Sequence, residues 1–402
     1  MTPPALTPKG RDTFVLSLVD RRDDQAKPTP KVAGMTTALR LALGAQAAGA
    51  RAIHLGHGAE HLAASLHDPR LKIAPRADAP EDDVVVIEVA SNVVLHRGLF
   101  AALRDAVADG RARSCGSSDA AVHARPPTLA RASGGPPVPF VFAPPFGFPP
   151  IAIHSRRDAR RATTMLLRSL RKTQDGWTST YLNRHVSLAL TRLLVHTPLR
   201  PNQLSVAILG VGIASGVVAA RGSRDALILG AALLQVQSVL DGCDGELSRI
   251  TFRGSKLGEW LDTIGDDVSN YGFFAGASYG LYRAGGGPAY LAIGAIVVGC
   301  GLLTSGLEYR YLASIGSGDL ARYPLGLAED AGRPTTMVGG IVAAIQPLFK
   351  RDTFVLLTFI AATVGLLGPM LAVFAVGGIG IVVAVIKAEL RMARERAARR
   401  TG

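Results

Sequence analysis

The sequence predicts a two-part protein, in which a small N-terminal α/β domain precedes an α-helical integral membrane domain with six transmembrane helices. The first observation is composition: 48% of the 402 residues are hydrophobic and 19% are charged, whereas soluble domains carry about 25% charged residues. The second is a change along the chain, from short apolar runs before residue 150 to long uncharged runs after residue 200. The third is a formal net charge of +13, with cations gathered beside the apolar runs.

The N-terminal domain is expected over residues 1–150. Residues 14–19, 52–55 and 84–89 are short runs rich in Val, Ile and Leu, which is typical of strands, and residues 36–48 have the pattern of a helix. Alternating strands and helices indicate an α/β domain. Residues 133–150 contain seven prolines and are expected to form a linker or an irregular edge.

A basic linker and an amphipathic juxtamembrane helix are expected over residues 151–200. Seven cations lie between residues 156 and 172 against one acid, and residues 181–196 carry apolar residues at helical spacing with cations between them. Such a helix can lie on a soluble core. The apolar runs that follow favour an interfacial position at a membrane surface.

The membrane domain is expected over residues 201–390. Uncharged stretches cover residues 203–220, 226–240, 268–282, 285–307 and 353–386; the last is long enough for two spans separated at Gly368-Pro369, which brings the count to six. Residues 335–349 are too short for a further span and are expected to be interfacial or re-entrant. Both flanks are basic, including a tail at residues 391–402, so both termini are expected in the cytoplasm, at the cytoplasmic (inner) membrane of a bacterium. The tail is expected to contact lipid phosphate, with no nucleic acid bound.

Acidic residues within these spans form a pattern. Asp241 and Asp244 are three residues apart and share a helix face, and Asp262 and Asp266 follow at an interval of four. Four carboxylates at low dielectric repel one another, and Arg249 with Lys256 cannot neutralise all of them. Oxygen ligands without His or Cys suit two Mg²⁺ or Mn²⁺ ions, which bind diphosphates and support displacement at phosphorus. An ion-coupled membrane carrier is the competing interpretation.

These residues resemble a known signature. The chain reads D-G-C-D-G-E-L-S-R over 241–249, then eight residues, then G-E-W-L-D-T-I-G-D. This is similar to the pattern D-x-x-D-G-x-x-A-R-x8-G-x3-D-x3-D of the CDP-alcohol phosphatidyltransferase (CDP-alcohol phosphotransferase) family. One position differs, since Ser248 replaces the family's alanine. The resemblance implies six spans preceded by an amphipathic helix, and a homodimer.

The resemblance also implies roles for individual residues. Asp241, Asp244, Asp262 and Asp266 would hold two metal ions, and Asp266 would be the catalytic base; Asp267 follows directly, which leaves open which carboxylate accepts the proton. Residues implied to bind the CDP donor are Asn202, Ser205, Gly245, Ser248, Arg249, Ser255 and Gly258. The implied reaction transfers a substituted phosphate from a CDP-linked alcohol to a polyol or polyol-phosphate acceptor at the lipid bilayer, with release of CMP and formation of a phosphodiester. It serves phospholipid or inositol-phosphodiester synthesis, with CDP-diacylglycerol or CDP-inositol as donor.

Two further segments resemble bifunctional inositol-phosphate cytidylyltransferase / di-myo-inositol-phosphate phosphate synthases. Residues 172–205 are similar to the lead-in to their membrane domain, and residues 27–55 to part of their nucleotidyltransferase domain. The stretch Ser17 to Arg22 lacks the glycines that would close a loop on a triphosphate, and Glu88 is the acid nearest the end of the 84–89 strand. The N-terminal domain is therefore expected to be degenerate and catalytically inactive. The alternative is a bifunctional enzyme that also makes its CDP-alcohol from CTP.

Overall fold

The computed structural model describes residues 13–20, 22, 29–78, 80, 84–96, 98–107, 111–117, 119–127, 138–139, 148–171, 178–324 and 351–401. All of the predicted segment 335–349 and most of 133–150 lie outside these residues. The chain divides into two compact units. The first contains residues 1–170 together with 249–253, and the second contains residues 171–248 and 254–402.

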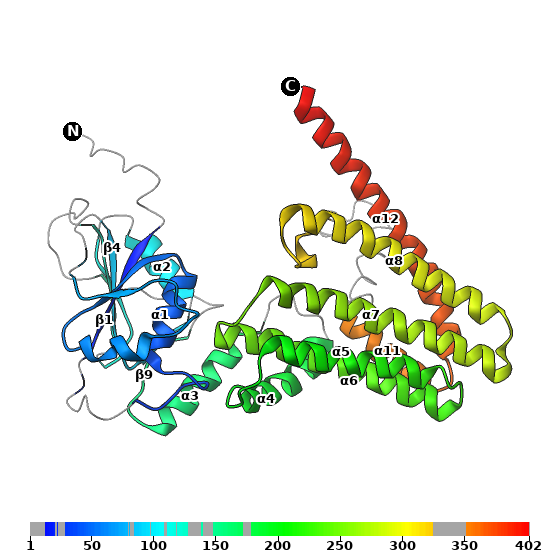
Figure 1. Ribbon diagram of the computed structural model, residues 1–402, viewed down its shortest axis with the longest axis horizontal. Coiled ribbons are helices and arrows are strands. Elements are labelled where there is room, and N and C mark those ends of the chain that lie inside the picture. The colour runs from blue at the N-terminus through cyan, green and yellow to red at the C-terminus, as the bar shows by residue number, and fades with distance from the viewer. Residues whose placement is uncertain are drawn as a thin grey trace. The chain divides into compact units, whose positions relative to one another are not determined.

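The first unit is built on a seven-stranded sheet with the strand order β3-β2-β1-β4-β7-β6-β8 (Figure 1). Strands β1, β2, β3 and β4 are parallel, whereas β7 is antiparallel to both β4 and β6. The three predicted strands are β1, β2 and β4, and β2 begins two residues earlier than predicted. The strands of this sheet are β1 Phe14–Val19, β2 Ala50–Leu55, β3 Pro75–Arg76, β4 Val85–Ala90, β6 Arg113–Cys115, β7 Val122–Arg125 and β8 Val138–Pro139.

Helices pack against this sheet. The predicted helix is α1 (Thr37–Ala47), and Thr36 caps it by accepting a hydrogen bond from the backbone N–H of Leu39, an interaction that typically contributes about 1 kcal/mol. The ring of Phe14 on β1 stacks on Phe100 of α2 at 5.8 Å, and both side chains are fully buried. The remaining elements are η2 Glu60–Leu66, α2 Gly98–Ala106, α3 Arg156–Arg168 and a small sheet of β5 Val93–Val94 with β9 Ile151–Ala152.

The second unit is helical. Within the described residues, four helices are long and apolar enough to cross a membrane: α5, α6, α8 and the Leu367–Glu395 part of α12. α7 has 26 residues, about 39 Å, which exceeds the ~30 Å hydrocarbon core, but its aspartates lower its hydropathy. The elements are η5 Ser179–Asn183, α4 Arg184–Leu194, α5 Pro201–Ala219, α6 Arg224–Thr251, α7 Lys256–Leu281, η6 Tyr282–Gly286, α8 Ala289–Ile315, η7 Leu320–Arg322, α11 Arg351–Thr363 and α12 Leu367–Thr401.

One predicted boundary is wrong. The uncharged stretch 353–386 does not break at Gly368-Pro369 but between α11 and α12, where Gly365 has a φ of 80°. That conformation favours glycine. Pro369 lies in the first turn of α12, where the missing N–H removes no intrahelical hydrogen bond.

Glycines allow α5 and α7 to approach closely. A Cβ at Gly216 of α5 would overlap the backbone of Gly272 and Phe273, and one at Gly276 of α7 would overlap the backbone of Gly216. Small residues four apart are a common way for membrane helices to pack. This contact holds α7, which carries two of the signature aspartates, against α5.

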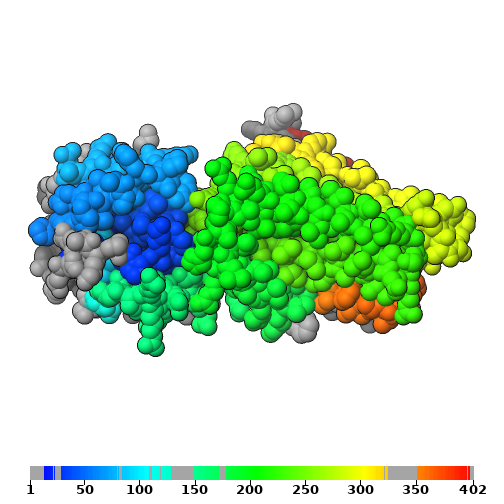
Figure 2. All heavy atoms as spheres, turned by 60° about the horizontal axis from the view of Figure 1, so that its bottom comes forward, coloured from blue at the N-terminus to red at the C-terminus, as the bar shows by residue number. Residues whose placement is uncertain are grey.

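Large apolar side chains are exposed on the outside of the second unit. Val217 on α5, Leu302 on α8 and Val376 on α12 are 62%, 60% and 73% exposed. Figure 2 shows one such face, where the green side chains of α5 and the beginning of α6 form a continuous surface. Exposed apolar surface on several long helices indicates that lipid covers this unit.

Candidate active site

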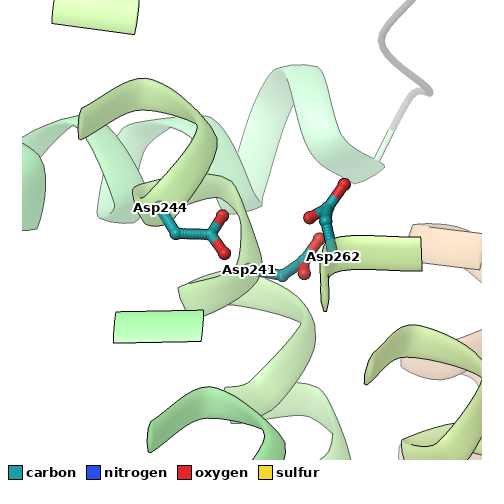
Figure 3. A group of neighbouring side chains, drawn as sticks. All are labelled: Asp241, Asp244 and Asp262. Carbon is teal, nitrogen blue, oxygen red and sulfur yellow. The ribbon is translucent and has the colours of Figure 1, made fainter. Parts of the chain in front are cut away.

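Three carboxylates meet between α6 and α7. Asp241 and Asp244 lie one turn apart on α6, and Asp262 comes from the second turn of α7. One oxygen of each lies within 4.8 Å of the other two, and Figure 3 shows the three side chains turned toward a shared space. The structure therefore brings together three of the four aspartates predicted to bind metal.

The donor set fits a hard divalent cation. Two oxygens bound to one Mg²⁺ at about 2.1 Å are separated by about 3 to 4 Å, so oxygens within 4.8 Å of one another need only small side-chain rotations. Asp244 is 5% exposed, and a buried carboxylate beside two others is costly without a cation. The group contains oxygen ligands alone, which favours Mg²⁺ or Mn²⁺ over Zn²⁺.

The fourth aspartate has a cationic partner. Asp266 accepts from Arg351 at 2.7 Å, and the same guanidinium nitrogen lies 3.1 Å from Asp241. Arg351 also donates to the side chain of Gln237 at 2.7 Å. Arg351 begins α11, so a cation distant in sequence reaches two of the predicted metal ligands.

Sequence reasoning missed Arg351 and Gln237. Gln237 lies four residues before Asp241 and thus on the same face of α6, a spacing that was visible in the sequence. Arg351 had no such signal, because its nearest site residue, Asp266, lies 85 positions earlier in the chain. The sequence offers Arg249 and Lys256 as local counter-charges, and the tertiary structure adds Arg351.

Asp267 faces different partners from Asp266. Its carboxylate accepts hydrogen bonds from Tyr309 at 2.6 Å and from Ser305 at 2.5 Å, both on α8. Tyr271 is hydrogen-bonded to the same Ser305 hydroxyl at 2.8 Å. Asp267 therefore joins α7 to α8, whereas Asp266 shares Arg351 with Asp241. This geometry favours Asp266 over Asp267 as the proton acceptor.

The predicted donor-binding residues of α5 and α7 lie at one end of these helices. Ser205 donates to Asp244 at 2.5 Å, so α5 contacts the carboxylate group directly. Ser255 caps α7 by accepting from the N–H of Gly258 at 3.0 Å. Asn202 lies 3.5 Å from Ser255, and a Cβ at Gly258 would be 3.0 Å from the Asn202 amide oxygen. The structure thus places Asn202, Ser255 and Gly258 together, with Ser205 bound to Asp244.

The donor-binding residues predicted on α6 follow one another along its last turns. Gly245 is half-buried, and Ser248 donates to the Gly245 carbonyl at 3.0 Å. A serine that bonds back to its own helix leaves the space of an alanine almost unchanged. Arg249 is half-buried, one turn beyond Gly245.

At the carboxyl end of the parallel strands, the first unit has an acid with its own partners. The Asp20 side chain is fully buried and accepts from Arg22 at 2.6 and 2.9 Å, with His61 at 3.3 Å. Glu88 on β4 pairs with Arg125 at 2.6 Å. Among the described residues, Asp20 after β1 and Glu88 on β4 are thus both engaged with side chains of the chain itself.

Comparison with known proteins agrees with this geometry. Residues 199–388 match the family described as CDP-alcohol phosphatidyltransferase. A protein of Thermococcus kodakarensis named bifunctional IPC transferase and DIPP synthase is 38% identical over 128 residues, which is 32% of this chain and 28% of that protein. A protein of the same name from Rubrobacter xylanophilus is 31% identical over 218 residues, which is 53% of this chain and 47% of that protein.

A third protein of that name, from Aquifex aeolicus, is 35% identical over 124 residues, which is 31% of this chain and 28% of that protein. The chain thus spans from about a quarter to about half of the length of these relatives. The matched region contains the acidic helices α6 and α7, three of the candidate spans in full and residues 367–388 of the fourth. Residues 199–388 of this chain are therefore similar to the CDP-alcohol phosphatidyltransferase family over nearly all of the helical unit's candidate spans.

Proposed function

We propose that this protein transfers a substituted phosphate group from a CDP-linked alcohol to the hydroxyl of a second alcohol, releasing CMP and forming a phosphodiester. The observation that carries the proposal is the meeting of three signature carboxylates, from α6 and α7, within 4.8 Å of one another. The match of residues 199–388 to the CDP-alcohol phosphatidyltransferase family supports the same chemistry. The competing carrier interpretation would need these carboxylates in a transport pathway, and neither the family nor the relatives' names support it.

Asp241, Asp244, Asp262 and Asp266 are proposed to hold two Mg²⁺ or Mn²⁺ ions, which would supply positive charge to the donor's diphosphate. Asp266 is proposed as the catalytic base, which takes the proton of the acceptor hydroxyl as its oxygen forms the new bond to phosphorus. The bond between that phosphorus and CMP breaks, and Arg249 binds the phosphates. Asn202, Ser205, Gly245, Ser248, Ser255 and Gly258 are proposed to line the CDP subsite.

The names of the relatives include DIPP synthase, which favours a CDP-inositol type of donor over CDP-diacylglycerol. A polyol or polyol phosphate is the proposed acceptor. We place the protein in a bacterial cytoplasmic membrane with both termini in the cytoplasm. We propose six spans, with α7 added to the four apolar helices and the sixth in the part of the chain that includes α11, with α4 at the interface and a homodimer as in the family.

The N-terminal domain, proposed over residues 1–150, is expected to be inactive as a nucleotidyltransferase. The relatives' name includes an IPC transferase activity, so the bifunctional enzyme is the second candidate. Two observations oppose it: no glycine occurs between Asp20 and Lys31, directly after β1, and Arg22 and His61 engage Asp20. The full chain carrying Asp266→Asn tests it, because pyrophosphate release from CTP and an inositol phosphate would then come from this domain.

CMP release from the detergent-purified protein tests the main proposal. CDP-inositol and CDP-diacylglycerol are each offered with polyols and polyol phosphates, with Mg²⁺ or Mn²⁺, and with Asp266→Asn in parallel. Metal-dependent CMP release that Asp266→Asn abolishes is the expected result and identifies the donor. Uptake of an ion into vesicles, with no CMP release and no metal-dependent binding of CDP, would instead favour the carrier.

A further inference from the structure

A second face of α6 carries a buried acid that the metal site does not use. Glu246 lies directly after Gly245 of the signature, at a position that the family pattern leaves variable, and it is 0% exposed. Its side chain accepts from Arg184 at 2.8 Å, Ser187 at 2.7 Å and Thr191 at 2.7 Å. A fully buried carboxylate with three donors is a demanding arrangement, since removal of one partner leaves a charge or a dipole unsatisfied.

All three donors come from the helix α4. Arg184, Ser187 and Thr191 are spaced three and four residues apart, on one helix face, and are 7%, 1% and 0% exposed. The opposite face of α4 exposes Val186 and Leu193, which are 44% and 69% exposed. α4 therefore turns polar side chains toward Glu246, whereas its exposed residues include the apolar Val186 and Leu193 beside His185 and Arg192.

The contact between α4 and α6 extends along the signature. A Cβ at Gly242 would be 3.2 Å from the side chain of Ser187, and the Cys243 thiol lies 3.6 Å from the Ser187 carbonyl oxygen. Gly242, Cys243 and Glu246 thus contact α4, while Asp241 and Asp244 face α7. The two sets alternate along fewer than two turns, so a rotation of α6 that breaks one contact also displaces the other.

We propose that the Arg184–Glu246 pair, with Ser187 and Thr191, positions α6 against α4 and thereby sets the orientation of Asp241 and Asp244. Glu246 is a positioning residue for the metal-binding carboxylates, and α4 is part of the support of the site. The kinetic part of this inference rests on the proposed function; its structural and metal-binding parts do not.

The test variant is Glu246→Gln in the full-length protein. Glutamine keeps the size of the side chain and one acceptor oxygen but removes the negative charge that Glu246 presents to the buried Arg184 cation. Glu389→Gln is the control, because Arg310 and Glu389 also form an Arg–Glu ion pair, at 2.6 Å between α8 and α12. This pair is more exposed than Arg184–Glu246 and involves no residue of α6. The double variant Arg184→Gln with Glu246→Gln replaces the ion pair with a neutral one that can still be hydrogen-bonded.

Three measurements are made on each variant: hydrogen exchange of the α4 amides, Mn²⁺ affinity by electron paramagnetic resonance, and CMP release at saturating donor. Glu246→Gln is expected to raise exchange in residues 184–194 and to weaken Mn²⁺ binding by about tenfold, as changes to groups that orient metal ligands do. The turnover number of Glu246→Gln is expected to fall together with its Mn²⁺ affinity, with little change in the KM for the acceptor. The double variant restores protection of α4 and most of the Mn²⁺ affinity, and Glu389→Gln changes neither.

Unchanged α4 exchange and Mn²⁺ affinity in Glu246→Gln would overturn the proposal. So would faster α4 exchange with normal Mn²⁺ affinity, because the pair would then hold α4 without acting on the site. If Glu246→Gln does not fold, Ser187→Ala and Thr191→Val each remove one hydrogen bond to the same carboxylate, and a graded loss of Mn²⁺ affinity is expected. Absence of CMP release in the wild type would refute the proposed function and leave the exchange and Mn²⁺ results to decide this inference.

Discussion

Two groups of acidic side chains in this protein have opposite surroundings. In the first unit, the buried Asp20 is bonded to Arg22, two residues away, and to His61. In the second unit, the carboxylates of Asp241, Asp244 and Asp262 face one another within 4.8 Å. An acid with a cation two residues away is satisfied by its own chain segment. Carboxylates that face one another repel, and a bound divalent cation lowers the energy of that repulsion. This difference in partners distinguishes a structural acid from a metal-binding one.

The largest expected effect breaks the acidic group itself. Asp262→Asn removes a carboxylate that meets the two from α6, and Asp266→Asn removes the proposed base; each is expected to lower CMP release by about a thousandfold or more. Asp225→Asn is the control, because Asp225 is exposed in the first turn of α6 and lies far from the site along the helix. Near-normal turnover in Asp262→Asn would contradict the metal-site assignment.

Removal of the metal ions tests the role of the acidic group without a mutation. Treatment with EDTA is expected to abolish CMP release, and added Mg²⁺ or Mn²⁺ to restore it, because oxygen ligands select these ions. Circular dichroism should change little on chelation, since the only group among the described residues that could hold a metal ion is formed by these aspartates, and the sheet of the first unit does not involve them. Turnover that persists in excess EDTA would rule out the proposed cofactor.

Arg351 tests how a protein cation and a metal ion compete for the same acids, because the tertiary structure brings it to Asp241 and Asp266. Its guanidinium opposes a divalent ion at the same carboxylates, so Arg351→Gln is expected to tighten Mn²⁺ binding by about tenfold. Titration with Mn²⁺ followed by electron paramagnetic resonance measures this. Arg310→Gln, which removes a cation paired with Glu389, should leave the affinity unchanged, and weaker binding in Arg351→Gln would show the expected direction to be wrong.

A smaller effect is expected at Asp267. Tyr309→Phe removes a hydrogen bond to Asp267 and should lower stability by about 1 kcal/mol while turnover stays within about threefold. Asp267→Asn should likewise retain most CMP release. The ratio of turnover in Asp267→Asn to that in Asp266→Asn decides which carboxylate is the base, and a ratio below one would reverse the assignment.

The smallest effect on activity is expected at Asp20. Burial raises the pKa of this carboxyl, but hydrogen bonds from Arg22 outweigh it and the net pKa is lowered. Because the folded pKa lies below the unfolded value of about 3.9, the stabilisation is present above pH 4 and is lost as pH falls through the folded pKa. The melting-temperature difference between wild type and Asp20→Asn, measured by calorimetry on the full chain, should therefore shrink below about pH 4. CMP release at pH 7 should not change.

Much of the fold could be predicted from local patterns. The strands at 14–19 and 84–89 and the helix at 36–48 are short segments whose hydrophobic spacing and capping residue Thr36 act within a few positions. The sequence pattern puts the break between α11 and α12 three residues too late, at Gly368-Pro369 and not at Gly365, because proline is tolerated in the first turn of a helix. The close packing of α5 on α7 was also missed, although Gly212 and Gly216 have the required spacing of four.

The sequence by itself determined the acidic pattern and its chemistry, because the spacing of Asp241, Asp244, Asp262 and Asp266 is a property of two helices and the turn between them. Tertiary structure alone decided which cation reaches these carboxylates and which helix supports them. Arg351 and the donors to Glu246 lie on helices far away in the chain, and contacts between distant segments leave no periodicity for a sequence pattern to detect. Asp266 and Asp267 show the same limit: adjacent residues of one type are chemically identical until the packing of α7 between its neighbours gives them different partners.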